Sequence, residues 1–341
     1  MVRAITYSTA GGSDVLRLTE RPEPVPGPGE VRVRVAVSGV NPTDWKSRSG
    51  ATGAGPSAES VPNQDGAGTV DAVGEGVDPA RVGERVWLWE AAWQRTDGTA
   101  QELVALPAEQ AVPLPEGAGP ELGASLGIPA LTAHRCLTVH EAGPDHLAPG
   151  ALAGRRVLVQ GGAGAVGNAA VQLARWAGAE VAATVSSPEK AELARRAGAQ
   201  HVIDYRREDA AAAVRAAFPE GVDVVVEVAP AQNAALDAAV LAPHGVVAVY
   251  ANDGGDEAAL PVRLLMGPNA RWQFVLVYTE PRAAKLRAVQ DVSAAVTAGA
   301  FRVGEEHGLP LLRFPLERTA EAHDAVEAGA VGKVLVDVQP A

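Results

Sequence analysis

The chain has 341 residues, and 47% of them are hydrophobic, which is enough for two domains with buried cores and excludes a largely disordered protein. Its 29 basic and 41 acidic residues give a net charge of -12, so we expect neither nucleic acid nor an anionic membrane surface as a partner. The single cysteine excludes a disulfide within the chain, and no apolar run has the length of a signal-peptide core or a membrane span, so we expect a cytoplasmic protein.

The first part of the chain, up to about residue 125, is predicted to be rich in β-structure. Val31, Val33, Val35 and Val37 alternate with polar or small residues, which is typical of a half-buried strand over residues 30–40. Residues 66–77 and 83–89 predict two more short strands, and segments rich in proline and glycine separate them. No long helical period occurs in this region.

From Ile128 onward, predicted strands and helices alternate. We expect strands over residues 155–160, 180–185, 201–205, 222–229, 246–251 and 271–279, with helices over 166–179 and 186–198 and further helical segments between the later strands. This alternation predicts a doubly wound parallel sheet with right-handed crossovers. A helix over 281–298, a strand over 309–316, a helix over 317–329 and a closing strand over 333–338 complete the chain.

The closing strand needs a sheet to join, and the β-rich N-terminal region is the favoured host. We therefore expect a discontinuous β-rich domain over residues 1–126 and 300–341. The parallel-sheet domain is expected over residues 127–299.

The stretch GGAGAVG follows a predicted strand directly and precedes a predicted helix directly. Gly162, Gly164 and Gly167 form the pattern G-x-G-x-x-G, which is weak alone and stronger in this context. Here the backbone from Gly164 through Ala165 and Val166 is expected to approach a pyrophosphate, because the helix N-terminus offers free N–H groups and a positive dipole. The sequence thus predicts a Rossmann dinucleotide site; an ordinary tight turn is the alternative.

The end of the second strand of this unit distinguishes NADP(H) from NAD(H). Enzymes that bind NAD place Asp or Glu there, about 20 residues after the glycine pattern, to bind the ribose 2′-hydroxyl. Here Thr184, Ser186 and Ser187 replace the acid, and Lys190 lies one turn into the next helix, within reach of a 2′-phosphate. We expect NADP(H), with the alternative that the two serines only cap the helix.

Several segments of the chain resemble the medium-chain dehydrogenase/reductase superfamily, and within it the zinc-free quinone oxidoreductases related to zeta-crystallin. Besides the glycine loop they are GVNPTDWKSRSG (39–50), DGAGTVDAVGEGV (65–77), VGERVW (82–87), IPALTAHRCL (128–137) and VIDYRRED (202–209). The resemblance covers nearly the whole chain. It implies a GroES-like (chaperonin-10-like) catalytic domain, a Rossmann cofactor domain, an active site in the cleft between them, and a homodimer or a tetramer.

The resemblance also bears on metal binding. Zinc-dependent relatives have a cysteine where this chain has Asn41 and a histidine near Gln64, where Asp65 is the one possible ligand. A catalytic zinc needs about three Cys, His, Asp or Glu ligands, so we expect no metal. Without that Lewis acid, the expected hydride acceptor is a quinone or an α,β-unsaturated carbonyl, because its charge delocalises and one or two hydrogen-bond donors suffice.

The resemblance implies two groups of cofactor residues. At the nicotinamide end it implies Asn41, Asp44, Thr132, Tyr250, Ala251, Asn252, Phe274 and Val275. Around the 2′-phosphate it implies Ser186, Ser187, Lys190 and Tyr205, with Arg206 beside them. The alternatives are that Asn41 and Asp44 only fix a turn and that Tyr205 only packs on the sheet.

The substrate-lining segment departs from the family pattern. Quinone reductases of this branch often have tyrosines shortly after the Asn-x-x-Asp motif, whereas this chain has Trp45 and Lys46 there. An indole can stack on a planar acceptor, and a lysine can donate a hydrogen bond or a proton. We therefore expect Asn41, Asp44, Trp45 and Lys46 to serve catalysis. Alternative functions are a pathway-specific enoyl or enone reductase and a non-catalytic NADPH-binding protein.

Overall fold

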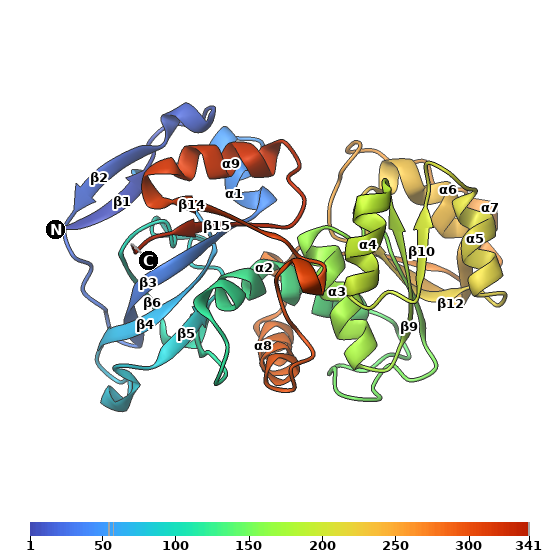
Figure 1. Ribbon diagram of the computed structural model, residues 1–341, viewed down its shortest axis with the longest axis horizontal. Coiled ribbons are helices and arrows are strands. Elements are labelled where there is room, and N and C mark those ends of the chain that lie inside the picture. The colour runs from blue at the N-terminus through green and yellow to red at the C-terminus, as the bar shows by residue number, and fades with distance from the viewer. Residues whose placement is uncertain (54, 57, 340–341) are drawn as a thin grey trace. The chain divides into compact units, whose positions relative to one another are not determined.

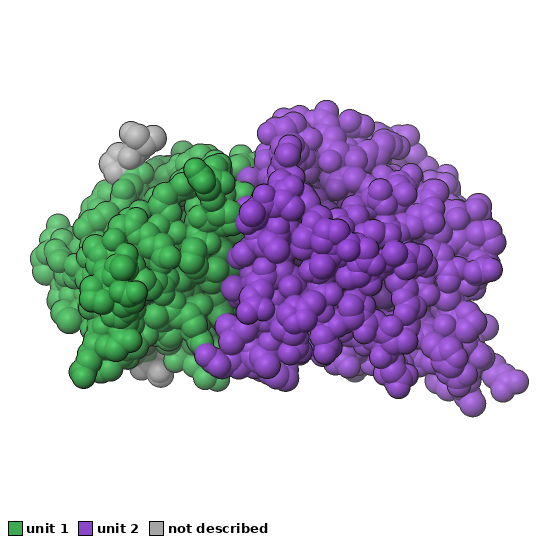
Figure 2. Space-filling view, turned by 90° about the horizontal axis from the view of Figure 1, so that it is seen from below, with its two compact units in different colours: residues 1–128, 311–341 green, residues 129–310 purple. Residues whose placement is uncertain are grey.

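The computed structural model describes residues 1–53, 55–56 and 58–339, and its contacts divide the chain into two units. Unit 1 comprises residues 1–128 and 311–341, and unit 2 comprises residues 129–310; Figure 2 colours them green and purple. These boundaries differ by two and eleven residues from the expected ones, 126/127 and 299/300. Residues 300–310 belong to unit 2 because Gln172 and Asn168 donate hydrogen bonds to the carbonyls of Arg302 and His307.

Unit 1 contains a seven-stranded, mostly antiparallel sheet and a separate two-stranded hairpin (Figure 1). Its strands are β1 (Val2–Thr6), β2 (Arg17–Arg21), β3 (Glu30–Val40), β4 (Asp65–Val73), β5 (Arg85–Leu88), β6 (Leu103–Pro107), β7 (Ala111–Pro113), β14 (Leu311–Pro315) and β15 (Lys333–Asp337). Its helices are α1 (Pro42–Ser49) and α9 (Thr319–Glu327), and the first residues of α2 (Pro120–Leu137) also belong to it.

The closing strand joins the N-terminal sheet, as the sequence predicted. Strand β15 pairs antiparallel with β3, with Val334 opposite Val40 and Val336 opposite Ser38. Buried aliphatic side chains of β3, β4, β6 and β15 form the core of unit 1, because alternate residues of each strand face inward. Helix α1 was not predicted from the sequence, because its eight residues are too few to display a long helical period.

Unit 2 is a six-stranded parallel sheet in the order β10-β9-β8-β11-β12-β13. Its strands are β8 (Arg156–Val159), β9 (Glu180–Val185), β10 (His201–Asp204), β11 (Val222–Glu227), β12 (Leu241–Val249) and β13 (Arg271–Phe274). Its helices are α3 (Ala165–Trp176), α4 (Pro188–Arg196), α5 (Ala210–Ala217), α6 (Pro230–Val240), α7 (Val262–Met266) and α8 (Arg282–Thr297), together with most of α2.

The crossovers of unit 2 confirm the doubly wound fold. The chain runs outward from β8 through β9 to β10, and then returns past β8 to β11, β12 and β13. Because parallel crossovers are right-handed, this reversal puts α3 and α4 on one face of the sheet and α5 and α6 on the other, as Figure 1 shows. The strands are buried runs of valine and alanine covered on both faces, as parallel sheets require.

Strand β13 is shorter than predicted. The sequence predicted a strand over 271–279, whereas pairing with β12 ends at Phe274 and a short 3₁₀ helix follows over Val277–Thr279. Among the described residues, no helix combines the length and the apolar character that crossing a membrane requires.

Candidate functional site

The carboxyl ends of the unit 2 strands bring most of the predicted cofactor residues to one edge of the sheet. The glycine loop follows β8, Ser186 follows β9, Tyr205 follows β10 and Tyr250 follows β12. Strand β8 is also where the strand order reverses, and ligands of doubly wound sheets bind at the carboxyl ends beside such a reversal. The sheet topology therefore selects this edge as the candidate cofactor site.

The glycine loop is shaped by close approaches that leave no room for side chains. Gly161 has φ +69°, in the left-handed region that favours glycine. A Cβ added at Gly162 would lie 2.6 Å from the Cβ of Ala183, and one added at Gly167 would lie 2.3 Å from the carbonyl oxygen of Gly161. These glycines thus hold the loop against β9 and against the first turn of α3.

Gly164 differs from these glycines because the space beside it is open. A Cβ added at Gly164 would meet only the Gly161 carbonyl oxygen, at 3.5 Å, among the described atoms. Gly164 is also the N-cap of α3 and offers no side chain, so the first-turn N–H groups of Ala165 and Val166 have no side-chain cap. An uncapped helix N-terminus with a cleared loop before it fits a pyrophosphate.

The end of β9 is followed by hydroxyls and a lysine, and the Glu189 carboxylate in the first turn of α4 is hydrogen-bonded to Ser187. The Lys190 ammonium donates to the Ser186 hydroxyl at 3.1 Å, and the Ser187 hydroxyl accepts the Lys190 backbone N–H at 3.3 Å. Ser187 therefore caps α4, which was the alternative interpretation of that residue. Tyr205 is 51% exposed at the end of β10. Binding of a 2′-phosphate by these residues remains a prediction.

Thr184 does not take part in this group. The sequence analysis counted it among the residues that replace the ribose-binding acid, but its side chain is buried and its hydroxyl donates to Gln160 Oε1 at 2.6 Å. Thr184 is buried because β9 is covered on both faces, so that every residue from Val181 to Val185 is buried.

A pocket of about 640 Å³ lies beyond the carboxyl ends of β12 and β13. Five residues that were predicted for the nicotinamide end line it together: Tyr250, Ala251, Asn252, Phe274 and Val275. Thr132, the sixth such residue of unit 2, is buried on α2 and is not among the lining residues. Two residues after it, His134 Nε2 lies 2.7 Å from Asp291 Oδ2, so this histidine packs against α8.

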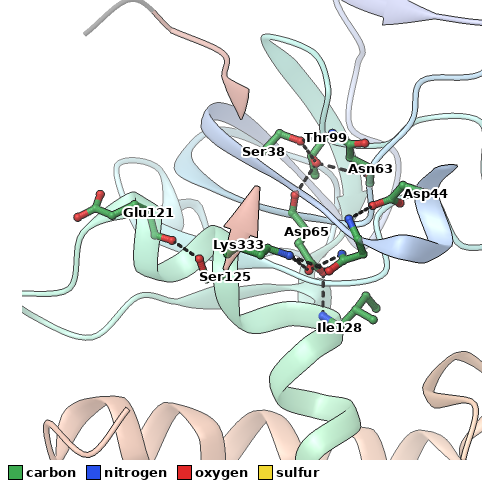
Figure 3. Close-up of polar contacts among 10 residues, drawn as sticks. Ser38, Asp44, Asn63, Asp65, Thr99, Glu121, Ser125, Ile128 and Lys333 are labelled. Carbon is green, nitrogen blue, oxygen red and sulfur yellow. Dashed lines mark hydrogen bonds and ion pairs between the residues drawn. The ribbon is translucent and has the colours of Figure 1, made fainter. Parts of the chain in front are cut away.

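The predicted catalytic residues of unit 1 lie beside a buried polar cluster, shown in Figure 3. Asn41 Nδ2 donates to Asp65 Oδ2 at 2.7 Å, and the Lys333 ammonium donates to Asn41 Oδ1 at 2.7 Å. Lys333 also lies 3.3 Å from Asp65 Oδ2, and Asp65 Oδ1 accepts the backbone N–H of Ile128 at 2.9 Å. These contacts use both polar atoms of the Asn41 side chain inside unit 1.

Asp44 closes the first turn of α1. One of its carboxyl oxygens, Oδ2, accepts the backbone N–H of Asn41 at 2.7 Å, which fixes the turn as the alternative interpretation held. Burial raises the pKa of Asp44 to about 8, and the Asp65 charge adds to this rise, so the carboxyl is mostly protonated at neutral pH. The next two residues are half-buried, and the Lys46 ammonium lies 5.9 Å from the ring centre of Trp45.

Two buried groups on α1 and α9, Arg48 and His323, were not predicted from the sequence, and Arg48 links the two helices. The guanidinium of Arg48 is buried and lies 2.7 Å from the Glu327 carboxylate on α9. On α9 the buried His323 ring lies 2.9 Å from Asn63 Oδ1, and burial next to Arg48 lowers the pKa of His323 to about 3. His323 is therefore neutral at physiological pH.

Comparisons with known proteins agree with this architecture. Residues 27–116 match the family model described as the alcohol dehydrogenase GroES-like domain, and residues 165–294 match the one described as zinc-binding dehydrogenase. A quinone oxidoreductase from Lama guanicoe is 31% identical, covering 98% of this chain and 97% of its own. The chain belongs to the medium-chain dehydrogenase/reductase superfamily, in its zinc-free quinone oxidoreductase branch.

Two solved structures of this superfamily are similar over nearly their whole length. A quinone oxidoreductase of Pseudomonas syringae pv. Tomato DC3000 has a TM-score of 0.83 and 28% identity, and the alignment covers 99% of this chain and 100% of that one. A mycobacterial protein in complex with NADPH has a TM-score of 0.82 and 29% identity, with 98% and 99% covered. The Rossmann and GroES-like folds expected from the sequence are thereby confirmed.

The residues of this medium-chain reductase do not fit the zinc ion that one of its family models is named for. Asn41 and Gln64 are amides, the Asp44 carboxyl accepts the backbone N–H of Asn41, and Asp65 lies 3.3 Å from the Lys333 ammonium. No group of three or more His, Cys, Asp or Glu side chains that could hold a metal occurs in residues 1–53, 55–56 and 58–339. A tetrahedral zinc needs three such protein ligands and tolerates no cation among them.

Lys333 is the polar residue of this cluster that sequence reasoning missed. It opens the closing strand KVLVDV, where a lysine before an apolar run is typical of an exposed strand end. Its partners Asn41 and Asp65 are 292 and 268 positions away. A polar residue in register with a buried asparagine could have been found only once the pairing of β15 with β3 was known.

Proposed function

We propose that the protein is an NADPH-dependent reductase that transfers hydride to a quinone or an α,β-unsaturated carbonyl. The observation that supports it most is the glycine loop, whose glycines have no side chains and which leads into a helix whose N-terminus has no side-chain cap. The next strand, β9, is followed by serines and a lysine. The mycobacterial relative in complex with NADPH and the quinone oxidoreductase relatives support the same cofactor and reaction.

The proposed acceptor class follows from the donor groups available. Bound NADPH supplies the hydride, and the charge that develops on the acceptor oxygen must be stabilised by this chain. Because the residues present do not fit a zinc ion, an acceptor that spreads its charge over an aromatic or enolate system is favoured. Hydrogen-bond donors such as the Lys46 ammonium are sufficient for such an acceptor.

We propose roles for the predicted catalytic residues on this basis. Trp45 provides a flat surface for a planar acceptor, and Lys46, whose ammonium lies over the indole, donates to the acceptor oxygen. Asn41 and Asp44 keep the start of α1 in place, and the protonated Asp44 is a store of one proton.

The cofactor proposal is tested by the variant K190A. Loss of the ammonium is expected to raise the Kd for NADPH by about tenfold, equivalent to ~1.4 kcal/mol, because one charge-assisted contact to a 2′-phosphate disappears. The Kd for NADH, which has no 2′-phosphate, should stay unchanged. Titration of cofactor fluorescence measures both constants.

The matched control is R195A, which removes a cation from the same helix at a side chain that is 58% exposed and paired with Glu192. It should leave both constants unchanged. Equal losses for NADPH and NADH in K190A would contradict the 2′-phosphate assignment. NADPH binding without turnover on a panel of benzoquinones, naphthoquinones and enones would contradict the reductase.

We also propose a homodimer formed through the free edge of β13. This strand pairs with β12 on one side only among the described residues, and exposed apolar side chains surround it: Val262, Leu264, Met266, Phe274 and Leu276. An unpaired edge with such a patch favours pairing with the same edge of a second copy.

The variant F274E should convert the dimer to a monomer, because it puts a charge on a side chain that is 67% exposed in one chain and buried in the proposed pair. Sedimentation velocity measures the change. The control V25E alters an equally apolar side chain in unit 1, 83% exposed, and should stay dimeric. A monomeric wild type would refute the dimer.

The remaining partners and the location are proposed from composition. A net charge of -12 disfavours nucleic acid, so the proposed partners are the cofactor, the small-molecule acceptor and the second copy. A cytoplasmic location is proposed because the one cysteine, Cys136, is buried and unpaired.

A further inference from the structure

A chain of buried hydrogen bonds runs beneath the glycine loop. Gln160, the residue before the loop, donates through Nε2 to Asp237 Oδ1 at 2.9 Å and accepts through Oε1 from the Thr184 hydroxyl at 2.6 Å. The same hydroxyl oxygen accepts the backbone N–H of Gly161 at 3.3 Å. Gln160, Thr184 and Asp237 are all buried, so each contact fixes the next.

The far end of this chain is a pair of buried carboxyl groups. Glu227, the last residue of β11, accepts from the backbone N–H of Ala229 and from Asn233 Nδ2 at 3.0 Å, which suits an ionised carboxylate. Asp237 lies on α6 with its side chain hydrogen-bonded to Glu227, and its Oδ2 accepts from no donor among the described residues. Both side chains are fully buried, and two adjacent buried carboxyls cannot both be ionised.

The position of the shared proton follows from these contacts. Glu227 is occupied by N–H donors, whereas Asp237 Oδ2 is free to carry a hydrogen and donate it to Glu227. Burial and the Glu227 charge raise the pKa of Asp237 well above its usual range. Asp237 Oδ1 then remains the acceptor that holds the Gln160 amide in one orientation.

We propose that Asp237 holds a proton against Glu227 and thereby positions Gln160, Thr184 and the Gly161 backbone for NADPH. Asp237 is a positioning residue in this proposal and does not touch the cofactor. The proposal rests on the proposed function, because it assumes that the glycine loop binds the dinucleotide.

Removal of the proton should weaken cofactor binding as the pH rises. A second negative charge would then lie beside Glu227, and in the described part of the chain no cation faces the pair. Tyr250, which follows β12, faces Glu227, and Cys136 and Asp253 face Tyr250 in turn. Repulsion between Asp237 and Glu227 would displace α6 from β11 and release Gln160, so the loop would lose its support.

Two substitutions at Asp237 distinguish the effect of its proton on NADPH binding from the effect of its side-chain volume. D237N has an amide that donates to Glu227 and accepts from Gln160, so it copies the protonated acid and has no proton to lose. D237L has a similar size and makes neither contact. NADPH fluorescence titrations from about pH 7 to about pH 10, with urea unfolding of each variant, measure the effects.

The wild-type Kd for NADPH rises with pH, whereas the D237N profile stays flat. At pH 7, D237L raises the Kd by about tenfold and D237N restores it to within about threefold of wild type. The variant T184V, which keeps the volume of the threonine, raises the Kd and removes most of the pH dependence, because the loop is no longer linked to Asp237.

Other outcomes overturn the proposal. Equal pH profiles for wild type and D237N overturn the proposed pH dependence, and equal losses in D237N and D237L show that volume alone matters. If D237L does not fold, the comparison of T184V with wild type decides: an unchanged Kd overturns the proposal. Wild-type protein that binds no NADPH at any pH overturns the proposed function as well, which distinguishes the two failures.

Discussion

Replacing Lys333 with methionine is expected to destabilise unit 1 by about 3–5 kcal/mol. Its ammonium lies 2.7 Å from Asn41 Oδ1 and 3.3 Å from Asp65 Oδ2, and the Lys333 and Asp65 side chains are 1% and 0% exposed. Burial raises the pKa of Asp65 and lowers that of Lys333, and each charge partly offsets the effect on the other. Without the lysine, Asp65 keeps a buried charge or takes up a proton, and both cost free energy.

Urea unfolding followed by tryptophan fluorescence measures the loss, because Trp87 and Trp89 are buried in unit 1. The double variant D65N/K333M has no unpaired charge and should lose less than K333M alone. K285M, at a partly buried lysine of unit 2, is the control and should keep the wild-type midpoint. A K333M protein as stable as wild type would refute the compensating role of the ion pair.

The second large effect is expected for G167A in the glycine loop. The added Cβ would lie 2.3 Å from the Gly161 carbonyl oxygen and 3.0 Å from the Gly162 Cα, which are backbone atoms that cannot rotate away. Gly161 must move, and the N–H groups of the loop move with it. We expect the Kd for NADPH to rise by about a hundredfold and the stability to fall by about 1–3 kcal/mol.

Calorimetric titration with NADPH and thermal unfolding measure the two effects separately. The comparison variant is G164A, whose Cβ meets only an oxygen at 3.5 Å and whose φ of −79° suits alanine. G164A should therefore keep the wild-type melting temperature and lose affinity only through the methyl group that it adds beside the phosphates. Unchanged NADPH affinity in G167A would argue against this loop as the cofactor site.

The sequence predicted unit 2 more completely than unit 1, for a physical reason. In a parallel sheet each strand is followed by its crossover helix, so local alternation of apolar runs and helical periods carries the topology. The strand over Glu180–Val185 and the helix after Ser187 were placed correctly in this way. The glycine loop was predicted because its residues are consecutive.

The contacts of unit 1 depend on residues that are far apart in the chain, and no local pattern reports them. The sequence predicted that the closing strand joins the N-terminal sheet. It did not predict the register with β3 that puts Lys333 beside Asn41. Local pattern also grouped Thr184 with Ser186 and Ser187, because the sequence does not show where along β9 burial ends.

The position of Lys333 after unit 2 in the chain has a consequence for how the protein is made. During translation, Asn41 and Asp65 are synthesised well before the lysine that contacts both. During that interval all of unit 2 emerges, and it contains every strand of its own sheet. The N-terminal sheet therefore lacks the cation that pairs with Asp65 until unit 2 has been synthesised. Unit 1 is thus completed after unit 2, although its synthesis begins first.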